Sequence, residues 1–209
     1  MSFSQLHNAH TVNDAVHGHK KLTPMSTVTS FYELSATLLS GKMEQFSKYE
    51  GRVTLLNELL HTYSARGLVI LAFPCNQFGK LEPLENDEIR LFLQTIRPGS
   101  KFEPKFQLFA KTEVNGSNCN PIYEYLKMKQ PFPLDDDGQL TRSADGFPWS
   151  PVTRYDISWN YEKFLITHDG QPVKRYTNRT KVEMLSRDIE NLLRKIPKSV
   201  KERLQLQTE

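Results

Sequence analysis

The candidate nucleophiles of this sequence are its two cysteines, Cys75 and Cys119. A cysteine becomes a nucleophile as its thiolate, so its surroundings decide whether it reacts. Cys75 follows an apolar run, at the kind of position where open α/β sheets bind ligands, and a reactive thiolate is one interpretation. We favour a packed, inert cysteine, because no Lys, Arg or His adjoins Cys75 in sequence. Cys119 precedes a predicted helix, whose start can lower a thiol pKa, but we expect a structural or surface role.

Metal chemistry is a second possibility, because four of the six histidines lie within the first thirty residues: His7, His10, His17 and His19. Imidazole is a common metal ligand. No cysteine or carboxylate cluster completes a site there, and the surrounding residues are polar without a sustained period. We therefore predict a disordered N-terminal tail over residues 1–30 and no metal.

Composition limits the class of protein. The chain has 209 residues, 38% of them hydrophobic, and a net charge of +3, which is too mild to indicate nucleic acid binding. No apolar run approaches the ~20 residues of a membrane helix. The first thirty residues lack the pattern of a secretory signal, and two cysteines make no disulfide framework. We expect a cytoplasmic α/β protein that binds neither nucleic acid nor membrane.

Hydrophobic periodicity predicts the elements in the first half of the domain. Apolar residues at helical spacing predict a helix over 55–66, which Gly67 ends. The continuous apolar run 68–73 predicts a strand buried on both faces, as in a parallel sheet. A polar loop follows, and then a helix over 87–97 that Asn86 caps.

The second half follows the same logic. Asn120 and Pro121 begin a helix that runs to residue 129, and 164–176 is a hairpin with Asp169-Gly170 at its turn. The last helix covers 182–196, and Pro197 ends it. One domain therefore spans residues 31–197, and a polar tail covers 198–209.

One element is missing from this pattern. A helix leading into a parallel strand is the second half of a βαβ unit, so another strand should precede residue 55. Only FSKYEGRVT stands there, with Gly51 and two residues of strand character. We therefore expect the first core strand to be deleted.

Three phrases carry a family resemblance: GLVILAFPCNQFGKLEP, RPGSKFEPKFQLFAKTEVNG and WSPVTRYDISWNYEKFLITHDGQPVKRY. Together they resemble the glutathione peroxidase family over roughly residues 31–193, and the loop before Trp149 resembles its tetrameric, glutathione-using branch. The resemblance implies a thioredoxin-like α/β fold with a central mixed sheet flanked by helices. It also implies reduction of hydrogen peroxide and organic hydroperoxides by glutathione, a role in antioxidant defence and a homotetramer.

The family's site is retained only in part. Its chemistry needs an ionised selenocysteine or cysteine, which neighbouring Gln, Trp and Asn side chains stabilise through hydrogen bonds. By resemblance, Trp159 and Asn160 are the family's Trp-Asn pair. Leu81 stands where the family has its glutamine and has no donor, whereas the nearby Gln77 matches a different position of the phrase.

The nucleophile itself is absent. By resemblance it belongs to a stretch that would fall between Val53 and Thr54, so the missing strand and the missing nucleophile are one deletion. In the first explanation, the prediction of the gene omitted a segment with an in-frame UGA codon, which encodes selenocysteine. Selenocysteine is also the only cofactor-like group that we expect. In the second, the chain is a real isoform or a degenerate paralogue, and Leu81 favours this.

Glutathione is the expected co-substrate. Its carboxylates suit basic side chains, and Arg97 and Arg179 match family arginines around the glutathione site. Thioredoxin is disfavoured as the electron donor because the chain lacks the family's second, resolving cysteine. Near the Trp-Asn pair, Asp156 and Glu162 are expected to form surface ion pairs with Arg154 and Lys163, while Trp149 is expected to pack.

The sequence thus predicts an enzyme family but an inactive chain. We expect a glutathione peroxidase homologue whose intact gene product is the enzyme. The alternative is a non-catalytic homologue that acts as a binding or oligomer-modifying subunit, through the surfaces around Arg97-Pro98-Gly99 and the loop 130–149.

Overall fold

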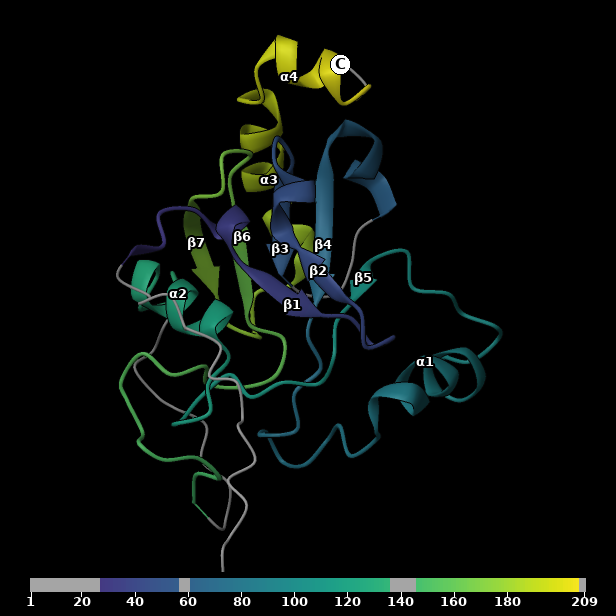
Figure 1. The fold of residues 1–209 in the computed structure, drawn as a ribbon, viewed down its shortest axis with the longest axis vertical. Coiled ribbons are helices and arrows are strands. Elements are labelled where there is room, and N and C mark those ends of the chain that lie inside the picture. The colour runs from purple at the N-terminus through teal and green to yellow at the C-terminus, as the bar shows by residue number, and fades with distance from the viewer. Residues whose placement is uncertain (1–26, 57–60, 136–145, 207–209) are drawn as a thin grey trace, which may run out of the picture.

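The computed structural model describes residues 27–56, 61–135 and 146–206. Its centre is a five-stranded sheet in the order β5-β4-β3-β6-β7 (Figure 1). The strands are β3 (Val53–Leu56), β4 (Leu68–Ala72), β5 (Gln107–Leu108), β6 (Lys163–Ile166) and β7 (Pro172–Tyr176). The expected mixed sheet is confirmed, because β3, β4 and β5 run parallel while β6 and β7 are antiparallel to their neighbours.

The central position of this sheet belongs to β3, which corrects two predictions. Residues 53–56 pair with β4 from Val53↔Leu68 and with β6 from Thr54↔Ile166. The first core strand is therefore present, and the helix predicted to begin at residue 55 is wrong. What remains of that helix is the short 3-10 helix η4 (His61–Arg66), while 57–60 lie outside the described residues. Residues 53–56 form a strand because an empty central position would leave the facing backbone groups of β4 and β6 unpaired.

Other elements follow the sequence pattern closely. The helices are α1 (Asn86–Thr95), α2 (Pro121–Lys129), α3 (Ser186–Arg194) and α4 (Lys198–Arg203), and η5 (Val182–Leu185) leads into α3. Asn120 caps α2, with its side chain accepting a hydrogen bond from the Ile122 amide. The cap of α1 is not Asn86 but Glu85, which forms a capping box with Glu88.

Two hydrophobic cores lie on opposite faces of the sheet. Along β6, Phe164 and Ile166 belong to one core and Leu165 to the other. The first core is covered by α2, η2 (Phe31–Glu33), η3 (Phe46–Tyr49) and the hairpin of β1 (Ser35–Thr37) and β2 (Met43–Gln45). The second is covered by η4, η5 and α3. In Figure 1, β1 and β2 cross in front of the sheet and α3 lies behind it.

Residues beyond 197 differ from the expected polar tail, because they begin with α4. The side chains of Val200 and Leu204 lie over Gly51, and Leu206 lies over Gly67. These contacts cover the ends where β3 and β4 begin. The proposed tail over residues 1–30 and its four histidines lie almost wholly outside the described residues, which begin at Thr27.

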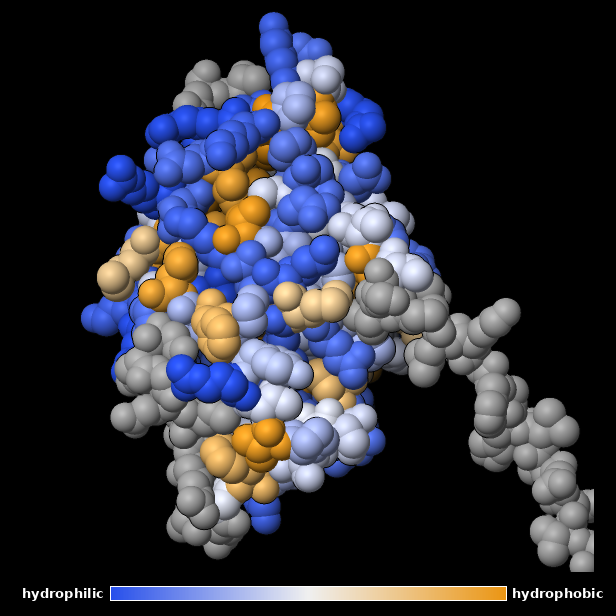
Figure 2. Space-filling model, turned by 90° about the vertical axis from the view of Figure 1, so that its left-hand side faces the viewer, coloured by the Kyte–Doolittle hydropathy of each residue, from blue (hydrophilic) through white to orange (hydrophobic). Residues whose placement is uncertain are grey.

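The face with α2 and β7 is turned toward the viewer in Figure 2, where hydrophobic residues form separate patches among hydrophilic ones. Within the described residues, no helix has the length and apolar character needed to cross a bilayer.

Candidate functional site

Trp159 and Asn160 lie shortly before β6, whose first residues pair with the last residues of β3. They therefore lie near the carboxyl-terminal ends of β3 and β4. The Trp159 ring packs on Phe78, with the ring centroids 5.8 Å apart, and Asn160 Nδ2 donates a 3.4 Å hydrogen bond to the Phe78 carbonyl. The structure thus joins the predicted Trp-Asn pair to the loop that follows β4.

Leu81 belongs to the same group. A side chain added at Gly79 would meet Leu81 and the Trp159 ring at 3.5 Å each, so these two side chains flank this glycine. Gly79 has a φ of 63°. Leu81 is 66% exposed, so the position that resembles the family's glutamine presents an apolar side chain to solvent beside Trp159.

Gln77 cannot replace that glutamine, because its side chain is already used. Its Oε1 accepts hydrogen bonds from the amides of Val114 (2.8 Å) and Asn115 (3.1 Å), and its Nε2 donates to the Asn115 carbonyl at 3.0 Å. Gln77 therefore holds the loop after β4 against the loop of residues 113–116, called the EVNG loop below.

The EVNG loop is tied in turn to the segment before Trp159. Asn115 is fully buried and exchanges hydrogen bonds with the backbone of Ile157, donating to its carbonyl and accepting from its amide at 2.9 Å each. Lys127 of α2 donates to the Val114 carbonyl at 2.8 Å and to Asn115 Oδ1 at 3.2 Å. Three loops distant in sequence are thereby fixed beside the Trp-Asn pair.

The two acidic residues near this pair are buried, which corrects the expectation of surface pairs. Asp156 accepts hydrogen bonds from Trp149 Nε1 at 2.9 Å and from Thr153, and lies 3.5 Å from Lys127 Nζ. Glu162 accepts from the Ser158 amide and pairs with Arg175 at 2.8 Å. The expected packing role of Trp149 is confirmed, since it is 7% exposed and its ring also contacts Phe78.

Arg175 is the largest fully buried side chain of the fold. Besides Glu162, its guanidinium donates to the carbonyls of Pro131 (2.7 Å), Tyr155 (3.0 Å) and Asp156 (2.9 Å). A charge at this depth is tolerated only when it is fully paired and hydrogen-bonded. Arg175 thus fixes the backbone of Tyr155 and Asp156, which shortly precede Trp159 in the sequence.

Neither cysteine has the surroundings of a nucleophile. Burial raises the pKa of Cys75 to about 11 and that of Cys119 to about 11. Both are buried, and Cys119 Sγ donates to the Val114 carbonyl at 3.0 Å. The packed interpretation of Cys75 is supported, and the lowered pKa considered for Cys119 is not found because desolvation dominates.

The two predicted glutathione arginines come from separate elements. Arg97 follows α1, is exposed, and precedes a cis proline, Pro98. Arg179 is also exposed and follows β7, where its amide donates to Thr177 Oγ1 at 3.3 Å. The described residues hold no group of three or more His, Cys, Asp or Glu side chains that could bind a metal.

Sequence reasoning missed the residues that build the site's support, namely Gln77, Asn115, Lys127 and Arg175. The phrases FPCNQFG and EVNG contain the first two, but nothing in a single sequence shows that one binds the backbone of the other. Lys127 and Arg175 resemble ordinary surface charges, because burial of a long basic side chain depends on tertiary packing.

The chain resembles known proteins in both sequence and fold. The family model described as glutathione peroxidase matches residues 31–127. Glutathione peroxidase 2 of Pongo pygmaeus is 42% identical over 182 residues, covering 79% of this chain and 95% of that protein. Glutathione peroxidase 1 of Macaca fuscata fuscata is 47% identical over 146 residues, covering 70% and 73%.

Among solved structures, the crystal structure of T. cruzi GPX1 matches with a TM-score of 0.53 and 25% identity, covering 78% of this chain and 96% of that one. The fold is therefore the expected thioredoxin-like α/β fold. With the Trp-Asn pair at the end of its central strands, the chain belongs to the glutathione peroxidase family.

Proposed function

We propose that the intact gene product is a glutathione-dependent peroxidase and that this chain is a form without its nucleophile. In the proposed reaction, a hydroperoxide and two glutathione thiols give an alcohol, water and glutathione disulfide. The O–O bond breaks, and the two sulfurs supply the two electrons and form the new S–S bond. Family membership supports peroxide reduction as the reaction.

The proposal rests on a site whose supporting residues are in place but whose described residues include no reactive nucleophile. Trp159 and Asn160 both contact Phe78 in the loop after β4, and the family resemblance supports their role as an anion-stabilising pair. The described cysteines are buried with pKa values of about 11, so very little thiolate exists at neutral pH. Leu81 supplies no donor.

Two findings support a missing segment. The alignment with the Pongo pygmaeus relative spans 182 residues although it covers only 79% of this 209-residue chain, so gaps open in this chain. In addition, the last two residues of β3, Leu55 and Leu56, belong to the run 55–66 whose periodicity indicates a helix. Both are consistent with a segment missing between Val53 and Thr54.

The first test is sequencing of cDNA across the Val53–Thr54 join. A strand-coding stretch with an in-frame UGA codon is expected and would make the intact protein a selenoperoxidase. A contiguous join would remove the peroxidase proposal for this gene product.

A second test restores the segment in recombinant protein and measures glutathione-dependent peroxide consumption. Activity is expected to rise further with Leu81→Gln, because the amide supplies the absent hydrogen bond to the anionic nucleophile. The matched control carries serine at the nucleophile and should be inactive with either residue at 81. No gain from Leu81→Gln would show that Leu81 is not a defect.

A second candidate is a non-catalytic subunit that joins active partners. One observation favours it: Val53–Leu56 fill the central position of the sheet, so the described strands form a continuous five-stranded sheet. This candidate requires a cooperative thermal melt and co-purification with the restored chain. A flat melt would eliminate it.

Further parts of the proposal concern the intact protein. We propose selenium as the nucleophile, glutathione as the donor with Arg97 and Arg179 near it, a cytoplasmic location and a homotetramer. The family resemblance supports these features. Charge reversal at Arg97 or Arg179 in the restored chain should raise the KM for glutathione, and sedimentation should give the mass of four chains.

A further inference from the structure

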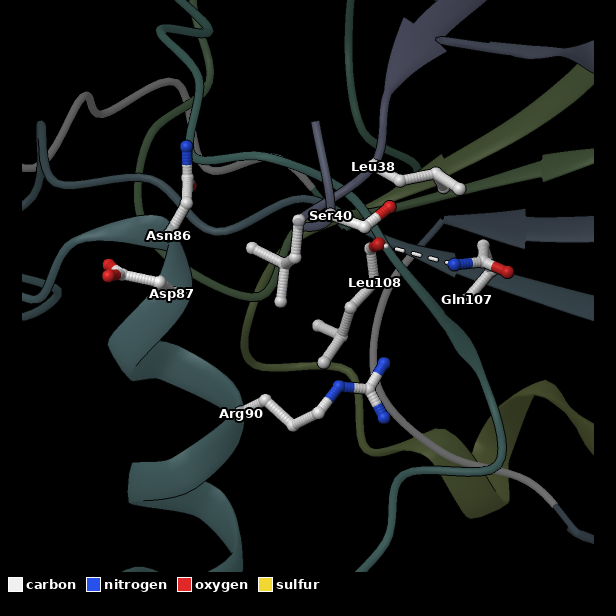
Figure 3. A pocket seen from close by; sticks show the side chains of 8 residues that line it. Leu38, Ser40, Asn86, Asp87, Arg90, Gln107 and Leu108 are labelled. Atoms are coloured by element: carbon white, nitrogen blue, oxygen red, sulfur yellow. Dashed lines mark hydrogen bonds between the residues drawn. The ribbon is translucent and has the colours of Figure 1, made fainter. Parts of the chain in front are cut away.

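A pocket of about 450 Å³ lies away from the Trp-Asn pair, between the β1–β2 turn, the first turns of α1 and β5 (Figure 3). Its size lies within the range of small-molecule sites. Its apolar lining consists of Leu38, Leu39 and Leu108, and its polar lining includes Ser40, Arg90 and Gln107. The pocket therefore combines an apolar surface with the positive charge of Arg90, which is exposed, and the negative charge of Asp87 at its border.

Arg90 is the charge that defines this pocket. Its side chain makes no hydrogen bond or ion pair with any residue that the structure describes, and Figure 3 shows its guanidinium extending toward Leu108. An arginine stays protonated at all physiological pH values and offers up to five N–H donors. All of them are available to a ligand.

The two other polar groups of α1 at the pocket's border are turned elsewhere. Asn86 Oδ1 accepts a 2.7 Å hydrogen bond from the Lys111 amide, so its acceptor is occupied. In Figure 3 the carboxylate of Asp87 points away from Leu108 and Arg90. The nearby carboxylate still disfavours multiply charged anions, so the complementary ligand carries one negative charge.

The apolar lining is held by the backbone. Leu38 forms an isolated bridge with Phe109, and the Ala110 amide donates to the Thr37 carbonyl at 2.8 Å. The turn is closed by the Leu38 amide on the Lys42 carbonyl at 2.9 Å. Leu108 is 5% exposed and forms the floor, whereas the partly buried Leu38 and Leu39 supply most of the surface that an alkyl chain would contact.

We propose that this pocket binds a small amphipathic monocarboxylate, with its carboxylate on Arg90 and its alkyl chain on Leu38, Leu39 and Leu108. Guanidinium and carboxylate form paired, charge-assisted hydrogen bonds, and the leucines bury the alkyl carbons. The site is independent of the peroxidase proposal, because none of its residues contacts the Trp-Asn pair in the interactions described above.

Octanoate tests the charge requirement, with octanol as its uncharged counterpart. Titration of the full chain by calorimetry, with ¹H–¹⁵N spectra in parallel, should give saturable octanoate binding that perturbs the amides of Leu39, Ser40 and Leu108. Arg90→Gln should weaken octanoate binding about tenfold or more, the loss expected for charge-assisted hydrogen bonds. Arg187→Gln, an exposed arginine on α3, is the matched control and should change nothing.

A second variant tests the apolar half of the pocket. Leu39→Ser should weaken octanoate binding while octanoate remains preferred over octanol. Equal binding of octanol and octanoate, unchanged affinity in Arg90→Gln, shifts centred on other residues, or no saturable binding would each overturn the proposal.

Discussion

At the scale of single residues, Thr54 is the outlier of the core. It lies in the middle of β3, is fully buried, and its hydroxyl has no hydrogen-bond partner among the described residues. Tyr32 lies beside it, but its own proton goes to the carbonyl of Arg52 or of Thr167. A buried hydroxyl without a partner is destabilising, so a central strand that carries one is poorly matched to its place.

We therefore predict that Thr54→Val stabilises the fold by about 1 kcal/mol, because it removes the unpaired hydroxyl at nearly constant volume. Urea unfolding at neutral pH measures this change. Thr177→Val is the matched control and should destabilise, since the buried Thr177 hydroxyl donates to Asp135. A clear loss of stability in Thr54→Val would mean that its hydroxyl is bonded to Tyr32.

The second residue-scale prediction concerns thiol reactivity. With its pKa raised to about 11 by burial, Cys75 should resist alkylation by iodoacetamide at pH 7 and react only in strongly alkaline solution. Cys75→Ser should leave any peroxide consumption unchanged. Mass spectrometry of the alkylated chain provides the measurement, and rapid labelling of Cys75 at pH 7 would return it to the list of candidate nucleophiles.

At the scale of elements, Asp188 couples β7 to α3. Its carboxylate pairs with Lys174 and accepts a 2.7 Å hydrogen bond from the Tyr176 hydroxyl. Burial alone would raise the pKa of Asp188, but the bonds from Lys174 and Tyr176 outweigh burial and lower it. The carboxylate therefore contributes stability above about pH 4, and this contribution is lost as pH falls through its lowered pKa.

From this we predict that Asp188→Asn costs about 1 kcal/mol at pH 7, a modest value because both partners are partly exposed. The difference from the parent chain should shrink steadily as the pH falls below about 4. Unfolding midpoints measured across this range decide the matter. A difference that stays constant down to the lowest pH would show that the charge of Asp188 is not what couples the two elements.

The elements also show how far the sequence alone leads. The strand at 68–72, the helix at 121–129 and the 164–176 hairpin were predictable, because their local signals agree with their place in the fold. The strand at 53–56 was not, because Leu55 and Leu56 fit a helical periodicity that continues to residue 66, whereas the sheet needs a central strand there. The Trp-Asn pair was found through family phrases, whereas its supports, such as Lys127 and Arg175, depend on burial that only tertiary structure shows.

At the scale of the whole molecule, the two cores share one sheet. Trp149 and Trp159 both belong to or pack against the first core, so tryptophan emission reports that side alone. Leu193 of α3 is 2% exposed and belongs to the second core. Adjacent residues of β6 point into opposite cores, so neither core can lose its packing without disturbing the strand that the other requires.

Leu193→Ala should therefore cost about 2–5 kcal/mol and lower the unfolding midpoint seen by tryptophan emission as much as that seen by far-UV circular dichroism. Leu91→Ala, at an exposed position of α1, is the control and should have little effect. An unshifted tryptophan transition would mean that the two cores unfold separately. In that case the short β3, which has only four residues, does not couple the two cores.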